Sequence, residues 1–135
     1  MATLLYKDLS YQIQGAFYQV YKILGNAFKE SVYHNALIEE MRIRNLVFET
    51  QKRINIYYES KKVGIYCPDL IIEDQIIIEI KAKFLLTDLD RQQFWQYLKG
   101  SNYKVGYLVN FGSLRKVELI RRVYDTARKP SRSLA

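Results

Sequence analysis

A chain of 135 residues is long enough for one domain that buries roughly two thirds of its unfolded surface around a single core. Its 49% hydrophobic and 14% aromatic content exclude an intrinsically disordered chain. The 21 Lys and Arg against 14 Asp and Glu give a net charge of +7, which favours a polyanionic partner such as nucleic acid, although a basic surface also serves solubility.

Apolar residues recur at helical spacing in the first third of the chain. The pattern runs from about Asp8 to Leu24, breaks at Gly25-Asn26, and resumes from Ala27 to Ile43. It predicts two helices, or one broken helix, with Asn26 as the N-cap of the second.

Short segments rich in β-branched and aromatic residues follow. Strands are predicted over 46–49 and 53–58, with a turn at 60–62, and then over 66–72 and 76–81. Both faces of the last two strands are apolar, so we expect them to be central in a sheet and covered on both sides.

The rest of the chain continues an α/β pattern. Thr87 is a candidate N-cap for a helix that ends at 100–102. A buried strand is predicted over 103–111 and an edge strand over 116–123. The order helix, helix, strands, helix, strand, strand predicts an α/β sandwich with a mixed central β-sheet flanked by helices.

Domain boundaries and compartment follow from simple features. We expect one domain over 1–124 and a basic, mobile tail over 125–135. The single cysteine, Cys67, cannot form an internal disulfide, and beside Pro68 it is expected to be a small buried residue. No apolar run is long enough to span a membrane and no secretory signal pattern opens the chain, so we expect a cytoplasmic protein without a membrane partner.

Two acids and one lysine stand on the isoleucine-rich strands. If residues 73–75 form a hairpin loop, Asp69 falls directly opposite Glu79, and Lys81 shares their face because strand side chains alternate. Opposed carboxylates repel one another, and a carboxylate on a covered strand needs a partner or a metal. The sequence therefore leaves two interpretations, an internal salt-bridge cluster or a cation site.

A hard dication suits such a pair of carboxylates. Mg²⁺ takes oxygen ligands and usually keeps several waters. Held there, it could polarise a phosphodiester and lower the pKa of a bound water, while Lys81 orients that water or offsets charge on phosphorus. Histidine and thiol chemistry is not expected, because His34 and Cys67 are the only residues of their kinds.

The same residues carry a family resemblance. Pro68-Asp69, followed about ten residues later by Glu79-Ile80-Lys81, resembles the PD-(D/E)xK motif of a large nuclease superfamily. Segments 24–33, 93–99 and 106–112 resemble blocks of the GxxExxY proteins, a group usually placed in that superfamily. Ala27 stands where the GxxExxY signature has its glycine, whereas Glu30 and Tyr33 are retained.

This resemblance, which covers roughly residues 10–123, implies a restriction-endonuclease-like αβ sandwich. It implies Asp69 and Glu79 as ligands of Mg²⁺ or Mn²⁺, with Lys81 as the catalytic lysine. It also implies Glu30 as a further acid that reaches the metal or its water. Gln93 and Tyr97, four residues apart on one helical face, would position the substrate or the lysine.

Each of these residues also has a purely structural interpretation. Glu30 could cap its helix or pair with a lysine, and Gln93 could simply face solvent. Tyr33 and Tyr97 could be core tyrosines with one hydrogen-bonded hydroxyl. We further consider Lys83, Arg91, Lys99 and Tyr33 as nucleic-acid contacts, although each of the cations could equally belong to a solvated charged face.

The function predicted is that of a metal-dependent nuclease that hydrolyses phosphodiester bonds in DNA. The alternative is a catalytically silent nucleic-acid-binding or protein-interaction module on a nuclease fold, and a third is a structural subunit of a larger complex. Nucleic acid, preferably DNA, is the expected partner, and formation of a homodimer is left open.

Overall fold

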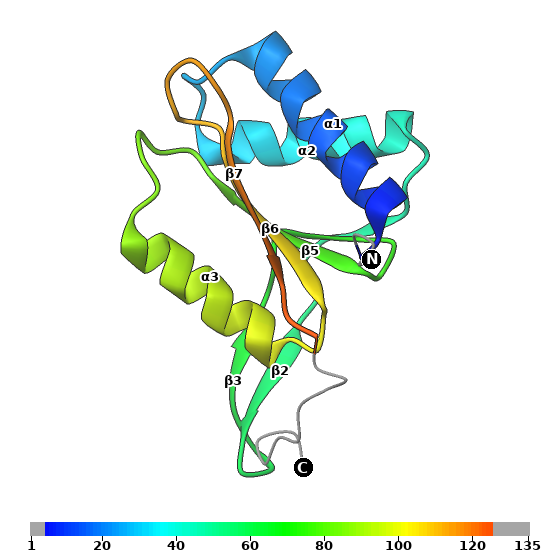
Figure 1. Ribbon diagram of the computed structural model, residues 1–135, viewed down its shortest axis with the longest axis vertical. Coiled ribbons are helices and arrows are strands. Elements are labelled where there is room, and N and C mark those ends of the chain that lie inside the picture. Colours follow the sequence, from blue (N-terminus) through cyan, green and yellow to red (C-terminus); the bar gives the residue numbers. More distant parts are fainter. Residues whose placement is uncertain (1–4, 126–135) are drawn as a thin grey trace, which may run out of the picture.

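The computed structural model describes residues 5–125 of the chain. Its elements follow the predicted order (Figure 1): α1 (Lys7–Leu24), α2 (Glu30–Ile43), β1 (Phe48–Glu49), β2 (Ile54–Tyr58), β3 (Lys61–Tyr66), β4 (Leu70–Ile72), β5 (Ile76–Lys81), α3 (Asp88–Gly100), β6 (Val105–Asn110) and β7 (Glu118–Val123). Of the tail predicted over 125–135, only Asp125 lies within the described residues. No helix within 5–125 combines the length and hydropathy needed to cross a bilayer.

The central sheet has five strands in the order β1-β4-β5-β6-β7. Only β5 and β6 are parallel, and the other neighbours are antiparallel, so the sheet is mixed. Residues of α1 and α2 pack with one face of the sheet, and residues of α3 pack with the other. This arrangement confirms the predicted αβ sandwich and is consistent with a restriction-endonuclease-like fold. The edge position of β7 is confirmed as well.

The isoleucine hairpin adopts the predicted register. Ile72 pairs with Ile76 across a three-residue loop. Glu73 and Asp74 both have φ 52°, the left-handed conformation that a tight hairpin turn of this hand requires, and Gln75 N–H donates to Ile72 O at 2.9 Å. The alternating isoleucines divide between the two cores as the period-two pattern predicts, so both faces of the hairpin are buried.

The start of α2 differs from the prediction. The helix begins at Glu30 with Lys29 as its N-cap, not at Ala27 with Asn26 as the cap. The reason is a tertiary contact: the Tyr33 hydroxyl donates to Gly25 O at 2.5 Å and accepts from Phe28 N–H at 3.3 Å. These bonds hold residues 25–28 as a loop, and Gly25 can follow it because glycine tolerates its φ of 72°.

The segment predicted as one strand over 66–72 is interrupted. Tyr66 ends β3, which pairs with β2 in a separate two-stranded sheet, and β4 begins only at Leu70. Pro68, which has no N–H to donate, stands in the break. Cys67 is exposed, so the expectation of a buried thiol is wrong. The turn predicted at 60–62 is also shorter and earlier, at residues 59–60.

Candidate active site

The two predicted acids face each other where backbone pairing between β4 and β5 ends. The last backbone pair between the two strands is Leu70 with Ile78. Beyond it, carboxylate side chains accept the hydrogen bonds that backbone carbonyls accept within the sheet. Asp69 N–H donates to Glu79 Oε1 at 3.2 Å, and Ile80 N–H donates to Asp69 Oδ2 at 2.7 Å. Each carboxylate is therefore fixed by a backbone donor of the opposite segment, and the opposed arrangement is as predicted.

Both carboxyl groups have raised pKa values. Burial, with the neighbouring charge of Asp69, raises the pKa of Glu79 to about 7. The pKa of Asp69 is raised mainly by burial, against the opposing effects of the Ile80 N–H bond and of the His34 and Lys81 charges. Burial thus disfavours the ionised form of both acids.

Lys81 and Glu30 lie close enough to this pair to act on its charge. Lys81 is the last residue of β5 and is half-buried, and its charge lowers the pKa of both Asp69 and Glu79. It forms no ion pair with any residue between 5 and 125. Glu30, the first residue of α2, is exposed, and partial desolvation and the charge of Asp69 raise its pKa. The structure therefore brings all four predicted residues into one electrostatic unit.

His34 belongs to the same group, although sequence reasoning set histidine aside. Its Nε2 lies 3.2 Å from the backbone oxygen of Asp69, and its charge lowers the pKa of Asp69 and of Glu30. His34 follows Glu30 by four residues, so the two share a helical face. This four-residue spacing is the sequence feature that could have placed His34 beside Glu30.

Tyr66 is a second residue that sequence reasoning missed. It is 5% exposed, and its ring stacks on Tyr97 with centroids 4.3 Å apart. Within residues 5–125 its hydroxyl makes no hydrogen bond of ordinary length and angle, but it lies close enough to the Glu79 carboxylate to lower the pKa of that group. Burial and the nearby charge of Glu79 raise its pKa above the ordinary value of a phenol. Tyr66 therefore places its hydroxyl beside Glu79, close enough for each group to shift the pKa of the other.

The two candidate residues on α3, Gln93 and Tyr97, differ in burial. Tyr97 is half-buried and reaches the site through its stacking on Tyr66. Gln93, one turn earlier on α3, is exposed. Only Tyr97 is thus in contact with the acid face of the sheet.

The donor set suits a hard dication. Asp69 and Glu79 supply carboxylate oxygens whose mutual repulsion and desolvation a cation would relieve. Within the described part of the chain, no three His, Cys, Asp or Glu side chains form a group close enough to hold a metal ion. The residues fit a cation that keeps several waters, not one enclosed by protein ligands.

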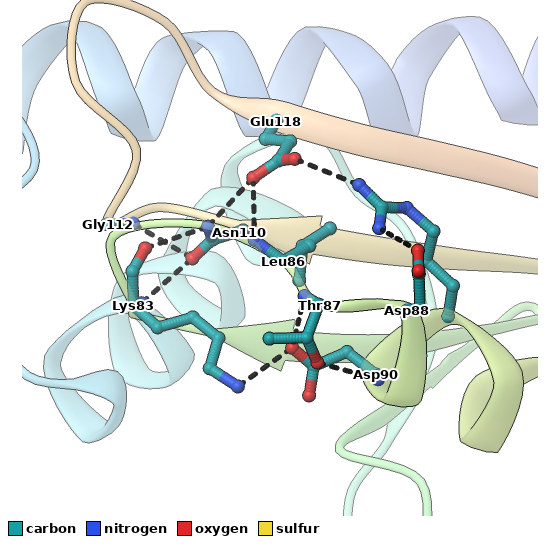
Figure 2. Close-up of polar contacts among 9 residues, drawn as sticks. Lys83, Leu86, Thr87, Asp88, Asp90, Asn110, Gly112 and Glu118 are labelled. Carbon is teal, nitrogen blue, oxygen red and sulfur yellow. Dashed lines mark hydrogen bonds and ion pairs between the residues drawn. The ribbon is translucent and has the colours of Figure 1, made fainter.

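A second polar network fixes the chain just after Lys81 (Figure 2). Asn110, at the end of β6, is fully buried and pairs in register with Lys81. Its Oδ1 accepts from Lys83 N–H at 2.9 Å and Gly112 N–H at 3.1 Å, and its Nδ2 donates to Lys83 O at 2.8 Å and Glu118 Oε1 at 3.0 Å. All four hydrogen bonds of this amide are thus made, and the two to Lys83 hold the segment that follows Lys81.

The cations considered as phosphate contacts are already engaged. Lys83 Nζ lies 2.7 Å from Asp90 Oδ2. Arg91 pairs with Asp88 at 3.3 Å and with Glu118 at 3.7 Å. Lys99 Nζ lies 5.5 Å from the ring centroid of Trp95. A phosphate at any of them has to compete with these partners.

Tyr33 requires a correction. Its side chain is 0% exposed, its ring stacks on Phe111 with centroids 4.7 Å apart, and its hydroxyl is bonded to the loop before α2. A side chain buried in this way cannot touch nucleic acid, so the prediction of Tyr33 as a contact residue is wrong.

The raised pKa of Glu79 predicts a pH dependence of stability. Because the folded-state pKa lies above the ordinary value of 4.5, the folded protein binds more protons than the unfolded chain between pH 4.5 and about 7. Stability of the metal-free protein is therefore expected to fall as the pH rises from about 4.5 to about 7 and to level off above that; between pH 5.5 and pH 8 the fall from this group is about 2 kcal/mol.

Urea unfolding in EDTA at pH 5.5 and pH 8 measures this change. Mg²⁺ should restore much of the lost stability at pH 8 and little at pH 5.5, and Glu79→Gln should flatten the profile. A wild-type profile that is already flat would contradict the prediction.

Comparison with known proteins gives one family. A family model described as the PD-(D/E)XK nuclease superfamily matches residues 7–123. No curated protein and no solved structure matched the chain. The matched segment runs from the first residue of α1 to the last residue of β7 and includes Asp69, Glu79 and Lys81.

Proposed function

Because the chain belongs to the PD-(D/E)XK nuclease superfamily, we propose that it is a metal-dependent nuclease that hydrolyses phosphodiester bonds in DNA. The observation that carries the proposal is the opposed pair Asp69 and Glu79, with raised pKa values, beside Lys81, which forms no ion pair with any residue from 5 to 125. Within the superfamily, the segments around Glu30, Gln93 and Asn110 support a place among the GxxExxY proteins.

Asp69 and Glu79 would hold Mg²⁺ or Mn²⁺, and Glu30 would accept a hydrogen bond from one of the waters that such an ion keeps. The bound ion would polarise the scissile phosphate and lower the pKa of a water. Lys81 is free to donate to the attacking water or to a phosphate oxygen, because no acid within residues 5–125 pairs with its ammonium group.

The two candidate residues on α3 would position other groups at the site. Tyr97 holds Tyr66 in place beside Glu79 by stacking, and the exposed Gln93 could donate to a phosphate on the same side of α3. Lys99, Lys83 and Arg91 would contact the substrate backbone outside the cleaved bond, the last two by exchanging an acidic partner for a phosphate.

A second function has one observation in its favour. Between residues 5 and 125 the carboxylates do not form a group of three that could by itself hold a metal, and this suits a silent nucleic-acid-binding module that has kept the fold. Such a module would bind without cutting.

Incubation of the pure protein with linear, circular, branched and single-stranded DNA, and with RNA, separates these functions. We expect cleavage of DNA in Mg²⁺ or Mn²⁺ and none in EDTA. Cleavage that persists in EDTA would contradict the proposed role of the carboxylates. Binding without cleavage under both metals would favour the silent module.

A further inference from the structure

Strands β2 and β3 form a ribbon of their own. In the described part of the chain they pair only with each other, and Figure 1 shows the ribbon running beyond the end of α3, away from α1 and α2. Three residues at its base, Ile54, Ile56 and Tyr66, pack into the core beneath α3. At its tip Glu59 and Ser60, with φ 49° and 68°, make a two-residue turn. The tip is therefore a narrow, exposed projection.

Each face of this tip carries a tyrosine paired with a lysine. Tyr58 pairs with Lys61 and Tyr57 with Lys62, and consecutive side chains point to opposite faces of a strand. Tyr57 is 45% exposed, Tyr58 is 58% exposed, and both lysines are exposed. Neither lysine forms an ion pair with any other residue from 5 to 125. A β-bulge at Val63 produces this pairing, because it shifts the register between Ile56 and Tyr57.

The ribbon is joined directly to the candidate active site. The chain leaves β3 at Tyr66 and reaches Asp69 after only two residues, and Tyr66 itself stacks on Tyr97 beside Glu79. A molecule held along the ribbon would consequently be brought to the face of the sheet that carries the acids.

We propose that the tip of the β2–β3 ribbon enters the major groove of duplex DNA and holds that duplex against the active site. The major groove of B-DNA, about 12 Å wide, admits a two-stranded ribbon, and both of its walls are lined by phosphates. A ribbon in the groove turns one face to each wall, so one lysine reaches each strand's phosphates while the tyrosine beside it contacts sugar or phosphate. The proposal rests on the proposed function for its link to cleavage, but not for binding.

The same geometry selects among nucleic acids. The major groove of an A-form RNA duplex is too narrow and deep to admit such side chains. A single strand has no second wall, so it would engage only one of the two tyrosine–lysine pairs. Duplex DNA is thus the substrate class that uses both faces.

A matched pair of variants tests the ribbon in the full chain. The ribbon variant is Tyr57→Ala, Tyr58→Ala, Lys61→Ala and Lys62→Ala. The control, on α1, is Lys7→Ala, Tyr11→Ala, Tyr18→Ala and Lys22→Ala; it removes the same residue types from four exposed positions. Anisotropy of a labelled duplex, titrated in EDTA over a range of KCl concentrations, measures binding without cleavage.

We expect the ribbon variant to raise the Kd for duplex DNA at least about tenfold and to lower the slope of log Kd against log salt by about 2, one per lost lysine–phosphate contact. The control should change the Kd less than about threefold. Thermal melting of each variant checks folding, and Lys61→Glu with Lys62→Glu, which keeps both tyrosines, is a second ribbon variant if the first fails to fold.

Three results would overturn the inference: no duplex binding by the wild type, an unchanged Kd and slope in the ribbon variants, or an equal loss for duplex DNA, single-stranded DNA and duplex RNA. If the wild type binds duplex DNA through the ribbon but never cuts it, the proposed binding role of the ribbon would be supported and the proposed nuclease activity would be contradicted. The two proposals can therefore fail separately.

Discussion

Asp69→Asn is expected to abolish DNA cleavage and, at the same time, to stabilise the metal-free protein. Asparagine keeps an oxygen for the bond from Ile80 N–H but removes the charge that faces Glu79. Relief of that repulsion should raise the free energy of unfolding at pH 8 by about 1 kcal/mol. Loss of a charged ligand should lower the single-turnover cleavage rate at least about a hundredfold.

Lys81→Ala is expected to have the opposite effect on stability from Asp69→Asn. It should lose cleavage to a similar degree, yet it should lower stability, because the Lys81 charge lowers the pKa of both acids and so offsets their repulsion. Glu39→Gln, at an exposed glutamate on the outer part of α2, should leave both measurements unchanged. Cleavage that survives Asp69→Asn would show that the activity lies elsewhere.

Asn110→Leu is expected to cost about 4 kcal/mol of stability, the largest stability effect that the polar contacts predict. Leucine has a similar volume but bonds none of the four groups that the amide satisfies, among them both backbone groups of Lys83. Each buried polar group left without a partner costs about 1–3 kcal/mol, and a sum of this size is rare for one substitution. Urea unfolding measures it.

Asn35→Leu is the matched control, because Asn35 is exposed on α2. It should change the free energy of unfolding by no more than about 0.5 kcal/mol. A loss below about 1 kcal/mol in Asn110→Leu would mean that water replaces the amide and that the network shown in Figure 2 contributes little.

The sequence predicts best where local rules decide the outcome. Alternation of isoleucines and a three-residue loop fix the register of Ile72 with Ile76, and that register alone places Asp69 opposite Glu79. Thr87 caps α3 as predicted, through reciprocal bonds with Asp90. In both cases the interacting residues are near neighbours in the chain.

Prediction fails where side-chain packing, and not a local sequence pattern, decides the structure. The loop before α2 is set by the Tyr33 hydroxyl, which overrides a good capping residue at Asn26. The proximity of His34 to Asp69 depends on how α2 packs on the central sheet. Tyr66 reaches Glu79 only because β3 leaves the central sheet, and no periodic pattern encodes that departure.

The exposed thiol beside the active site has a practical consequence. Cys67 is the chain's single cysteine and stands two residues before Asp69, on the connection between the ribbon and the carboxylates. A maleimide dye or nitroxide therefore attaches at one defined point of the unmutated protein. Binding of a paramagnetic ion such as Mn²⁺, or of a DNA duplex, would change the signal of a reporter at this position. Occupancy of the site can therefore be followed without engineering the chain.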